Sequence, residues 1–123
     1  TVNCGVWNEK TQLIFNSKNT SGSVISAEGN VTIEVDTIDN IVGDSAVDFI
    51  KMDIEGAELN ALKGAVKTIE KNIPTLAICV YHKVEDLITI PQFIKNICGD
   101  YKFYLRKHLI SSDCELVLYA VKN

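Results

Sequence analysis

Three carboxylates follow a short apolar run near the middle of the chain. In the segment IKMDIEGAE at 50–58, the acidic residues are Asp53, Glu55 and Glu58. Carboxylates in such a group can take up protons as general bases or can hold a divalent cation. They also suit a purely structural role, because negative charge near the start of a helix is stabilised by about 0.3–1 kcal/mol. For Asp53 and Glu55 both interpretations stay open, whereas the position of Glu58 favours the first turn of a helix.

A second candidate group follows another apolar run. His82 lies between Tyr81 and Lys83, directly after the segment TLAICVY at 75–81. An imidazole titrates near neutral pH, so it can share general-base work with a carboxylate or can ligate a metal. A single histidine after a buried strand can also be structural, and the residues alone do not decide this.

The elements around these residues predict an α/β arrangement. Over 47–123 the pattern reads β-α-β-α-β-β: strands at 47–52 and 75–81, a long helical segment between them, and a helix that Pro91 opens at 91–98. The segments KFYLR and ELVLYAV then form a terminal antiparallel hairpin. Strands that alternate with helices indicate a parallel sheet with right-handed crossovers. The hairpin leaves one strand antiparallel to the others.

This sheet is expected to bring the candidate residues together. The carboxyl ends of parallel strands meet at one edge, and neighbouring strands lie about 5 Å apart. Asp53 and Glu55 follow one such strand and His82 follows the next. We therefore expect Asp53, Glu55 and His82 at a common rim, as a catalytic group or as a metal site.

The first part of the chain has a different character. Residues 1–46 are rich in strand-like segments, namely VNCGVW, QLIF and VTIEV, with a polar loop at 16–30 that we expect to be mobile. Asp36 or Asp39 is expected to cap a short turn that leads to Val42. Gly64, inside the long helical segment, costs about 1 kcal/mol relative to Ala and indicates close approach to a neighbouring strand. The whole chain, 1–123, is interpreted as one domain.

Composition excludes several classes of protein. Hydrophobic residues make up 46% of the 123 residues, as in globular domains, and the net charge of −4 argues against nucleic-acid binding. No apolar stretch reaches membrane-spanning length, so no membrane partner is expected. The four cysteines form no CxxC pair and are interpreted as reduced thiols of a cytoplasmic protein.

A longer motif resembles a known family. The segment DFIKMDIEGAE at 48–58, followed by ALKGA at 61–65, is similar to the central motif of the FkbM-type methyltransferases. Segments around 35–39, 80–87, 101–106 and 115–121 resemble other parts of that family, in the same order. The family comprises class I enzymes that transfer a methyl group from S-adenosylmethionine to a hydroxyl, often on a sugar or a secondary metabolite.

The resemblance implies a fold and a set of roles. It implies a Rossmann-like sheet with helices on both faces and the strand order 3-2-1-4-5-7-6. It places Asp53 and His82 at the reacting rim, with Glu55 in contact with the substrate or with a metal. Asp53 is alternatively a residue of the cofactor pocket. The implied partner is a small-molecule or glycan acceptor.

One departure from the family limits these expectations. Residues 1–46 contain no strand, Gly-rich turn and helix of the kind that binds the cofactor. The chain therefore resembles the C-terminal part of the domain, and by itself it is expected to bind S-adenosylmethionine weakly or not at all. Without its neighbour, the strand at 47–52 has a free edge, which predicts a homodimer or coverage by residues 1–40.

Two other functions remain open at this point. A non-catalytic α/β module for interaction or assembly is the main alternative, and the missing cofactor segment supports it. A metal-dependent hydrolase that uses the carboxylates is less favoured, because no HxH or HExxH spacing occurs.

Overall fold

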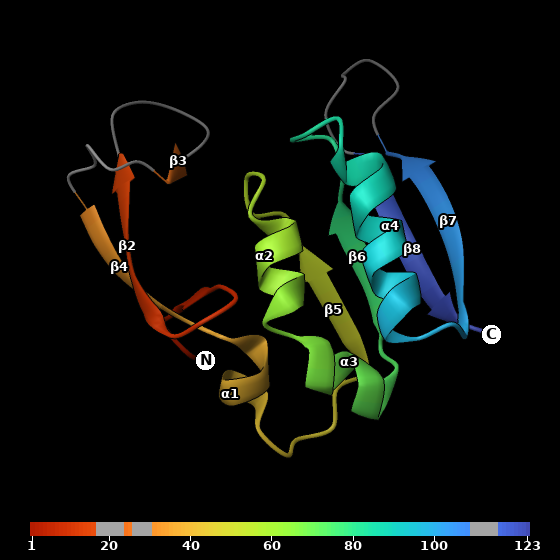
Figure 1. The fold of residues 1–123 in the computed structure, drawn as a ribbon, viewed down its shortest axis with the longest axis horizontal. Helices are drawn as coiled ribbons and strands as arrows, with labels where there is room; N and C mark the ends of the chain where they lie inside the picture. The colour runs from red at the N-terminus through yellow and green to blue at the C-terminus, as the bar shows by residue number, and fades with distance from the viewer. Residues whose placement is uncertain (17–23, 26–30, 109–115) are drawn as a thin grey trace.

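A computed structural model describes residues 1–16, 24–25, 31–108 and 116–123 and contains two four-stranded sheets (Figure 1). The first sheet has the order β1-β4-β2-β3, with β1 (Gly5–Val6), β2 (Thr11–Asn16), β3 (Val24–Ile25) and β4 (Val31–Asp36). The second has the order β5-β6-β8-β7, with β5 (Phe49–Met52), β6 (Thr75–Cys79), β7 (Tyr101–Lys107) and β8 (Leu116–Lys122).

The second sheet has the topology expected for the later half of the family's sheet. β5 and β6 are parallel, and β8 runs antiparallel to both β6 and β7. The order β5-β6-β8-β7 corresponds to 4-5-7-6 in the family's strand order. The predicted terminal hairpin and the single antiparallel strand are therefore confirmed. Among the described residues β5 pairs only with β6, so its other edge is free.

The main core lies between this sheet and the helices α2 (Glu58–Lys63), α3 (Val66–Asn72) and α4 (Asp86–Ile97). Alternate strand residues such as Leu76 and Ile78 face the helices, as the two-residue period of a strand requires. They pack against helix residues of which Leu62, Ile69 and Ile90 have no exposed surface. Each fully buried side chain of this kind contributes about 1.5–3 kcal/mol to stability.

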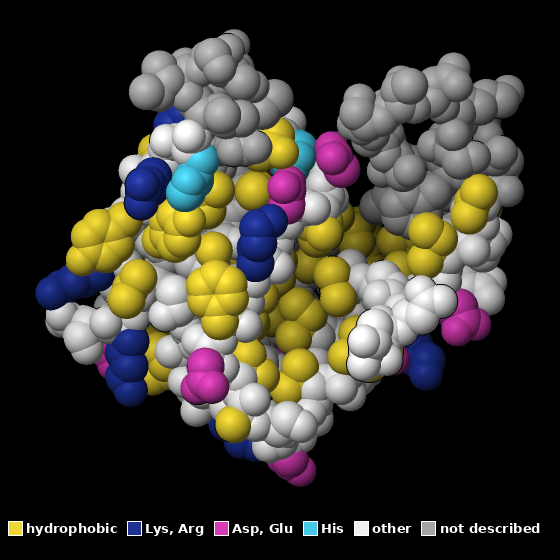
Figure 2. Space-filling view, turned by 180° about the vertical axis from the view of Figure 1, so that it is seen from behind, with side chains coloured by type: hydrophobic (Ala, Val, Ile, Leu, Met, Phe, Trp, Pro, Cys, Tyr) yellow, Lys and Arg dark blue, Asp and Glu magenta, His cyan; other side chains and the backbone are white. Residues whose placement is uncertain are grey.

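The helices cover one face of the second sheet, whereas the resemblance implied helices on both (Figure 1). Both crossovers, β5 to β6 and β6 to β7, move in the same direction across the sheet, so right-handed connections carry their helices to the same face. The opposite face holds a smaller buried cluster of Ala77, Cys79 and Val117. Figure 2 shows hydrophobic side chains at the surface seen from behind.

The long helical segment predicted after 53 is in fact two helices, because the chain bends at Gly64. A Cβ atom added there would lie 2.1 Å from the carbonyl oxygen of Trp7. Trp7 directly follows β1, so the predicted close approach is found, to the residue after a strand. The Gly64 carbonyl in turn accepts a hydrogen bond from the backbone N–H of Asp39 at 2.9 Å.

The helix predicted to open at Pro91 begins earlier, at Asp86, with Pro91 in its interior. A proline at this position removes one backbone hydrogen bond, usually at a cost of about 3 kcal/mol. Ile90 and Ile94, both fully buried, hold α4 against the core and offset that loss. The helix therefore begins before Pro91, the residue that was expected to start it.

The short helix α1 (Ile38–Val42) corrects the predicted cap. Thr37 is the N-cap, and its side chain accepts a hydrogen bond from the backbone N–H of Asn40 at 3.0 Å. Asp36 instead accepts from the backbone N–H of Thr37 and from the amide of Asn40. Asp39 caps a different helix, because its carboxylate accepts from the backbone N–H groups of α3 at Lys67 and Thr68.

Some predictions concern residues outside the described part. The loop expected to be mobile at 16–30 falls mostly there, although Asn16 ends β2 and Val24–Ile25 forms β3. Cys4, Cys79 and Cys98 are free thiols, as predicted, while Cys114 lies outside the described residues. Within the described ranges, every helix is too short or too polar to cross a membrane.

Candidate active site

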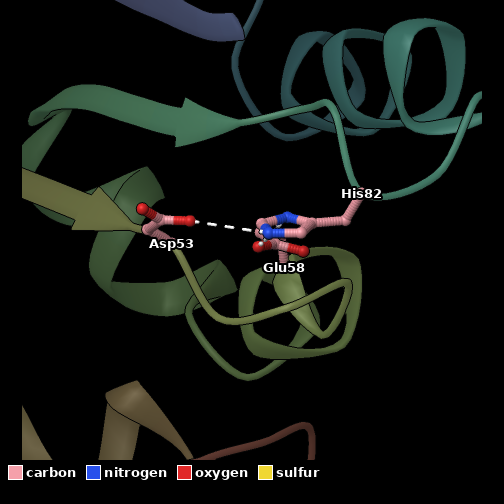
Figure 3. Close-up of side chains that lie close together, drawn as sticks. All are labelled: Asp53, Glu58 and His82. Carbon is pink, nitrogen blue, oxygen red and sulfur yellow. Dashed lines mark ion pairs between the residues drawn. The ribbon is translucent and has the colours of Figure 1, made fainter. Parts of the chain in front are cut away.

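The structure brings the three residues of the predicted rim into contact. Asp53 follows β5 and His82 follows β6, so both lie beyond the carboxyl ends of these paired parallel strands (Figure 3). The Nε2 atom of His82 lies 3.6 Å from Oδ1 of Asp53 and 3.4 Å from Oε2 of Glu55. The parallel pairing of β5 and β6 is what places residues 29 positions apart at one point.

Glu58 belongs to the same group, which the sequence interpretation missed. It is the first residue of α2, as expected, but its side chain has no exposed surface. Its Oε1 atom lies 3.1 Å from Nδ1 of His82 and accepts a hydrogen bond from the backbone N–H of Ile54 at 2.9 Å. Glu58 precedes Ala61 and Leu62 by three and four residues, so its place on the buried helix face was a usable signal.

A left-handed turn between β5 and α2 shapes the rim. Glu55 has φ 55° and Gly56 has φ 85°, and the N–H of Ala57 closes the turn on the carbonyl of Ile54 at 3.2 Å. A non-glycine residue in this region carries backbone strain, which here aims the Glu55 carboxylate at the imidazole. Gly56 also permits close packing of Lys83, whose ammonium donates to the Gly56 carbonyl.

Tyr81 contacts both Asp53 and His82 from the side of β6. Its hydroxyl donates a hydrogen bond to Oδ1 of Asp53 at 3.1 Å. Its ring lies against that of His82, with centroids 4.0 Å apart and an angle of 35° between the planes. Burial and the contact with Asp53 both raise the pKa of Tyr81, so its hydroxyl stays protonated and remains a donor.

His82 and its three neighbouring carboxylates differ in their access to solvent. The side chain of His82 is 9% exposed, whereas those of Asp53 and Glu55 are 39% and 46% exposed. The imidazole is thus held between the buried carboxylate of Glu58 and the two exposed carboxylates, and both of its ring nitrogens are buried. Asp53 and Glu55 are therefore the members of the group that a molecule from solvent meets first, and such carboxylates can accept a proton.

Nearby ionisable groups reflect the same burial. Asp86, at the start of α4, is almost fully buried, and burial raises the pKa of its carboxyl. Burial, followed by the charge of Asp53, raises the pKa of the Cys79 thiol to about 11. The Lys51 ammonium lies 3.8 Å from Oδ2 of Asp53 on the exposed side. Around the imidazole itself, the ionisable groups at ion-pair distance are the carboxylates of Asp53, Glu55 and Glu58.

Comparison with known proteins identifies the family. The family model of the methyltransferase FkbM domain matches residues 3–108. The crystal structure of methyltransferase FkbM from Methylobacillus flagellatus KT is similar, with a TM-score of 0.76 and 36% sequence identity. That likeness covers 95% of this chain and 27% of the other one, so this chain spans about a quarter of its length. No curated protein matches significantly.

The family match and the structural likeness agree with the order and direction of the strands described above. Because the family model covers most of the chain, this protein belongs to the methyltransferase FkbM domain family.

Proposed function

We propose that this chain forms the acceptor side of an S-adenosylmethionine-dependent O-methyltransferase. The observation that carries the proposal is the contact of His82 with Asp53 and Glu55 beyond the ends of β5 and β6. Ligands of open α/β sheets bind at this edge. Family membership supports methyl transfer as the reaction, and the proposal extends it to a hydroxyl acceptor.

The residues of the rim suit the proton transfer that such a reaction needs. A hydroxyl that becomes an ether must lose its proton, and a positioned base speeds such a step by about 10²–10⁴-fold. In this proposal His82 and Asp53 take that proton. Glu55 contacts the acceptor from the exposed side, and Glu58 acts as a positioning residue because it is buried between Nδ1 of His82 and the backbone N–H of Ile54.

The described residues do not by themselves fit the cofactor. β1 leads through the bend at 8–10 into β2, not into a helix. The turn after β5 does lead into a helix, but its single glycine is covered by Lys83 and His82. We therefore expect calorimetry to detect little or no binding of S-adenosylmethionine to this chain. Tight binding would contradict this.

The charge of the rim limits the acceptor class. Asp53, Glu55 and Glu58 surround the imidazole, and the chain carries a net charge of −4. A polyanion would be repelled by these groups, whereas a neutral hydroxyl compound would not. We propose a sugar, a glycan or a secondary metabolite as the acceptor.

Methyl transfer by the protein expressed from its natural gene tests this function. The assay follows labelled methyl groups from S-adenosylmethionine to a panel of hydroxyl compounds. We expect Asp53→Asn and His82→Gln to reduce turnover by about 10²-fold or more, and the exposed Glu70→Gln to leave it unchanged. Unchanged turnover in both rim variants would exclude these roles.

A non-catalytic interaction module is the second candidate. Its support is that the described glycines form no cofactor turn, while β5 keeps a free edge. The coding region upstream of Thr1 discriminates between the two functions. A strand with a Gly-rich turn there supports the enzyme, and an unrelated sequence supports the interaction module.

A further inference from the structure

We propose that Asp53, Glu58 and His82 bind one divalent transition-metal ion. Each offers one ligand atom, and these atoms all lie within 4.8 Å of one another. Two atoms that bind one ion at about 2.1 Å are separated by about 3–4 Å in tetrahedral or octahedral geometry. Only small side-chain shifts are needed to bring the three atoms to that spacing, and Figure 3 shows the side chains directed toward one another.

Unsatisfied buried atoms in this group point to a missing partner. Oε2 of Glu58 and both ring nitrogens of His82 are buried and have no hydrogen-bond partner. The 3.1 Å contact between Nδ1 and Oε1 is an ion-pair distance, but it does not have hydrogen-bond geometry. Leaving such groups unpaired inside a protein is costly, typically about 1–3 kcal/mol each. A metal ion would take a lone pair of Glu58 and that of one ring nitrogen, and the other ring nitrogen would then carry the proton and act as a donor.

The charge balance favours a divalent ion over a proton. Three carboxylates lie within 3.6 Å of the imidazole, and protonation of His82 would offset only one negative charge. Lys51 is 60% exposed and 3.8 Å away from Asp53, so solvent screens it. The ammonium of Lys83 is directed to the carbonyl of Gly56. A divalent ion supplies the positive charge that these neighbours do not.

The donor set indicates which ions fit. One imidazole nitrogen with carboxylate oxygens suits Zn²⁺ and Mn²⁺, whereas Mg²⁺ and Ca²⁺ prefer oxygen donors alone. Three protein ligands leave at least one position open, as in catalytic metal sites. The open side is that of Asp53 and Glu55, the two exposed carboxylates.

The metal site does not depend on methyl transfer, but it would refine the proposed function. A hydroxyl bound to the open position would have a lowered pKa. Asp53 and His82 would then bind the ion and would not take up the proton. Glu55, whose Oε2 lies 3.4 Å from the imidazole and which is 46% exposed, would take the proton of the acceptor.

Metal titration of the chelator-treated chain tests the site directly. Electron paramagnetic resonance follows the loss of free Mn²⁺ signal, and calorimetry follows Zn²⁺. We expect one ion per chain, and we expect Glu58→Gln, Asp53→Asn and His82→Gln each to weaken binding by about tenfold or more. The matched substitution Glu70→Gln, on the exposed side of α3, is expected to leave affinity unchanged.

The folding of each variant is checked by circular dichroism. If circular dichroism shows that the buried Glu58→Gln variant is unfolded, Asp53→Asn still reports, because Asp53 is 39% exposed. The absence of saturable binding would overturn the proposal. So would binding by Asp53→Asn and His82→Gln that is as tight as binding by the unsubstituted chain. The titration contains neither methyl donor nor acceptor, so its failure leaves the methyl-transfer assay as an independent test.

Discussion

Nδ1 of His82 lies 3.1 Å from Oε1 of Glu58, a carboxylate with no exposed surface. The two residues come from the end of β6 and the start of α2, so their contact depends on the packing of α2 against the sheet. Glu58 in turn is held by the backbone N–H of Ile54. The imidazole is thus fixed by the core, while its other nitrogen faces the exposed carboxylates of Asp53 and Glu55.

Removing this buried carboxylate is expected to destabilise the fold. Glu58→Ala removes the acceptor of the Ile54 backbone N–H and the buried carboxylate beside the imidazole, and leaving a polar group without its partner costs about 1–3 kcal/mol. Urea denaturation followed by circular dichroism measures the free energy of unfolding. The exposed substitution Glu70→Ala should change it by less than about 0.5 kcal/mol. Equal stability of the two variants would show that the buried contact contributes nothing.

Gly56→Ala is expected to destabilise the turn at the rim. The substituted residue must keep φ at 85°, and its Cβ would lie 3.0 Å from Cε of Lys83. Strain in this region costs about 1–3 kcal/mol. Gly99 is the control, because it lacks a positive φ and an added Cβ there would have nothing within 4 Å. Thermal unfolding should therefore rank Gly56→Ala as more damaging than Gly99→Ala; equal effects would contradict the strain and the packing of Lys83.

Much of this fold follows from the sequence because alternation and spacing are local signals. These signals gave the alternation of strands and helices after residue 47, and the rule that parallel strands end at one edge then gave the shared rim of Asp53 and His82. Gly64 signalled a close approach, but its partner is Trp7, 57 residues away, and a local pattern cannot name a contact so distant in the sequence. Glu58 was missed because a charge near a helix start suits the dipole, and that argument ignores the buried face to which the residue belongs.

Asp36 is expected to make stability depend on pH at the acid end. Hydrogen bonds from the amide of Asn40 and the backbone N–H of Thr37 lower the pKa of its carboxyl below the ordinary 3.8. Its contribution is therefore present above that value and is lost as pH falls through the lowered pKa. Urea denaturation should show Asp36→Asn less stable than wild type at pH 7, with the difference absent in strong acid. A difference that persists there would have another cause.

Cys79 is expected to react slowly with alkylating reagents. Its side chain is 3% exposed, and burial raises the pKa of the thiol to about 11, so little thiolate forms at pH 8. Cys4 and Cys98 are only partly buried. Iodoacetamide labelling of the folded chain, followed by peptide mass spectrometry, should modify Cys79 more slowly than these two. In urea the three rates should converge; fast labelling in the folded state would indicate that β6 opens.

The free edge of β5 is expected to make this chain a dimer. Among the described residues of 1–40, the strands β1 to β4 pair in a sheet of their own, and none of them pairs with the β5 edge. Phe49, on this strand, is 56% exposed, and an open apolar edge favours pairing with another strand.

Sedimentation velocity over a range of concentrations tests that pairing. We propose that the wild-type chain sediments as a homodimer and that Phe49→Lys shifts it to the monomer, because two like charges would meet at the interface. Ile88→Lys is the matched control, since Ile88 is 62% exposed on α4, on the helix-covered face and away from the edge. A wild-type chain that stays monomeric at every concentration would exclude the edge as a self-association site. If Phe49→Lys and Ile88→Lys weaken association equally, the association would not depend on the β5 edge.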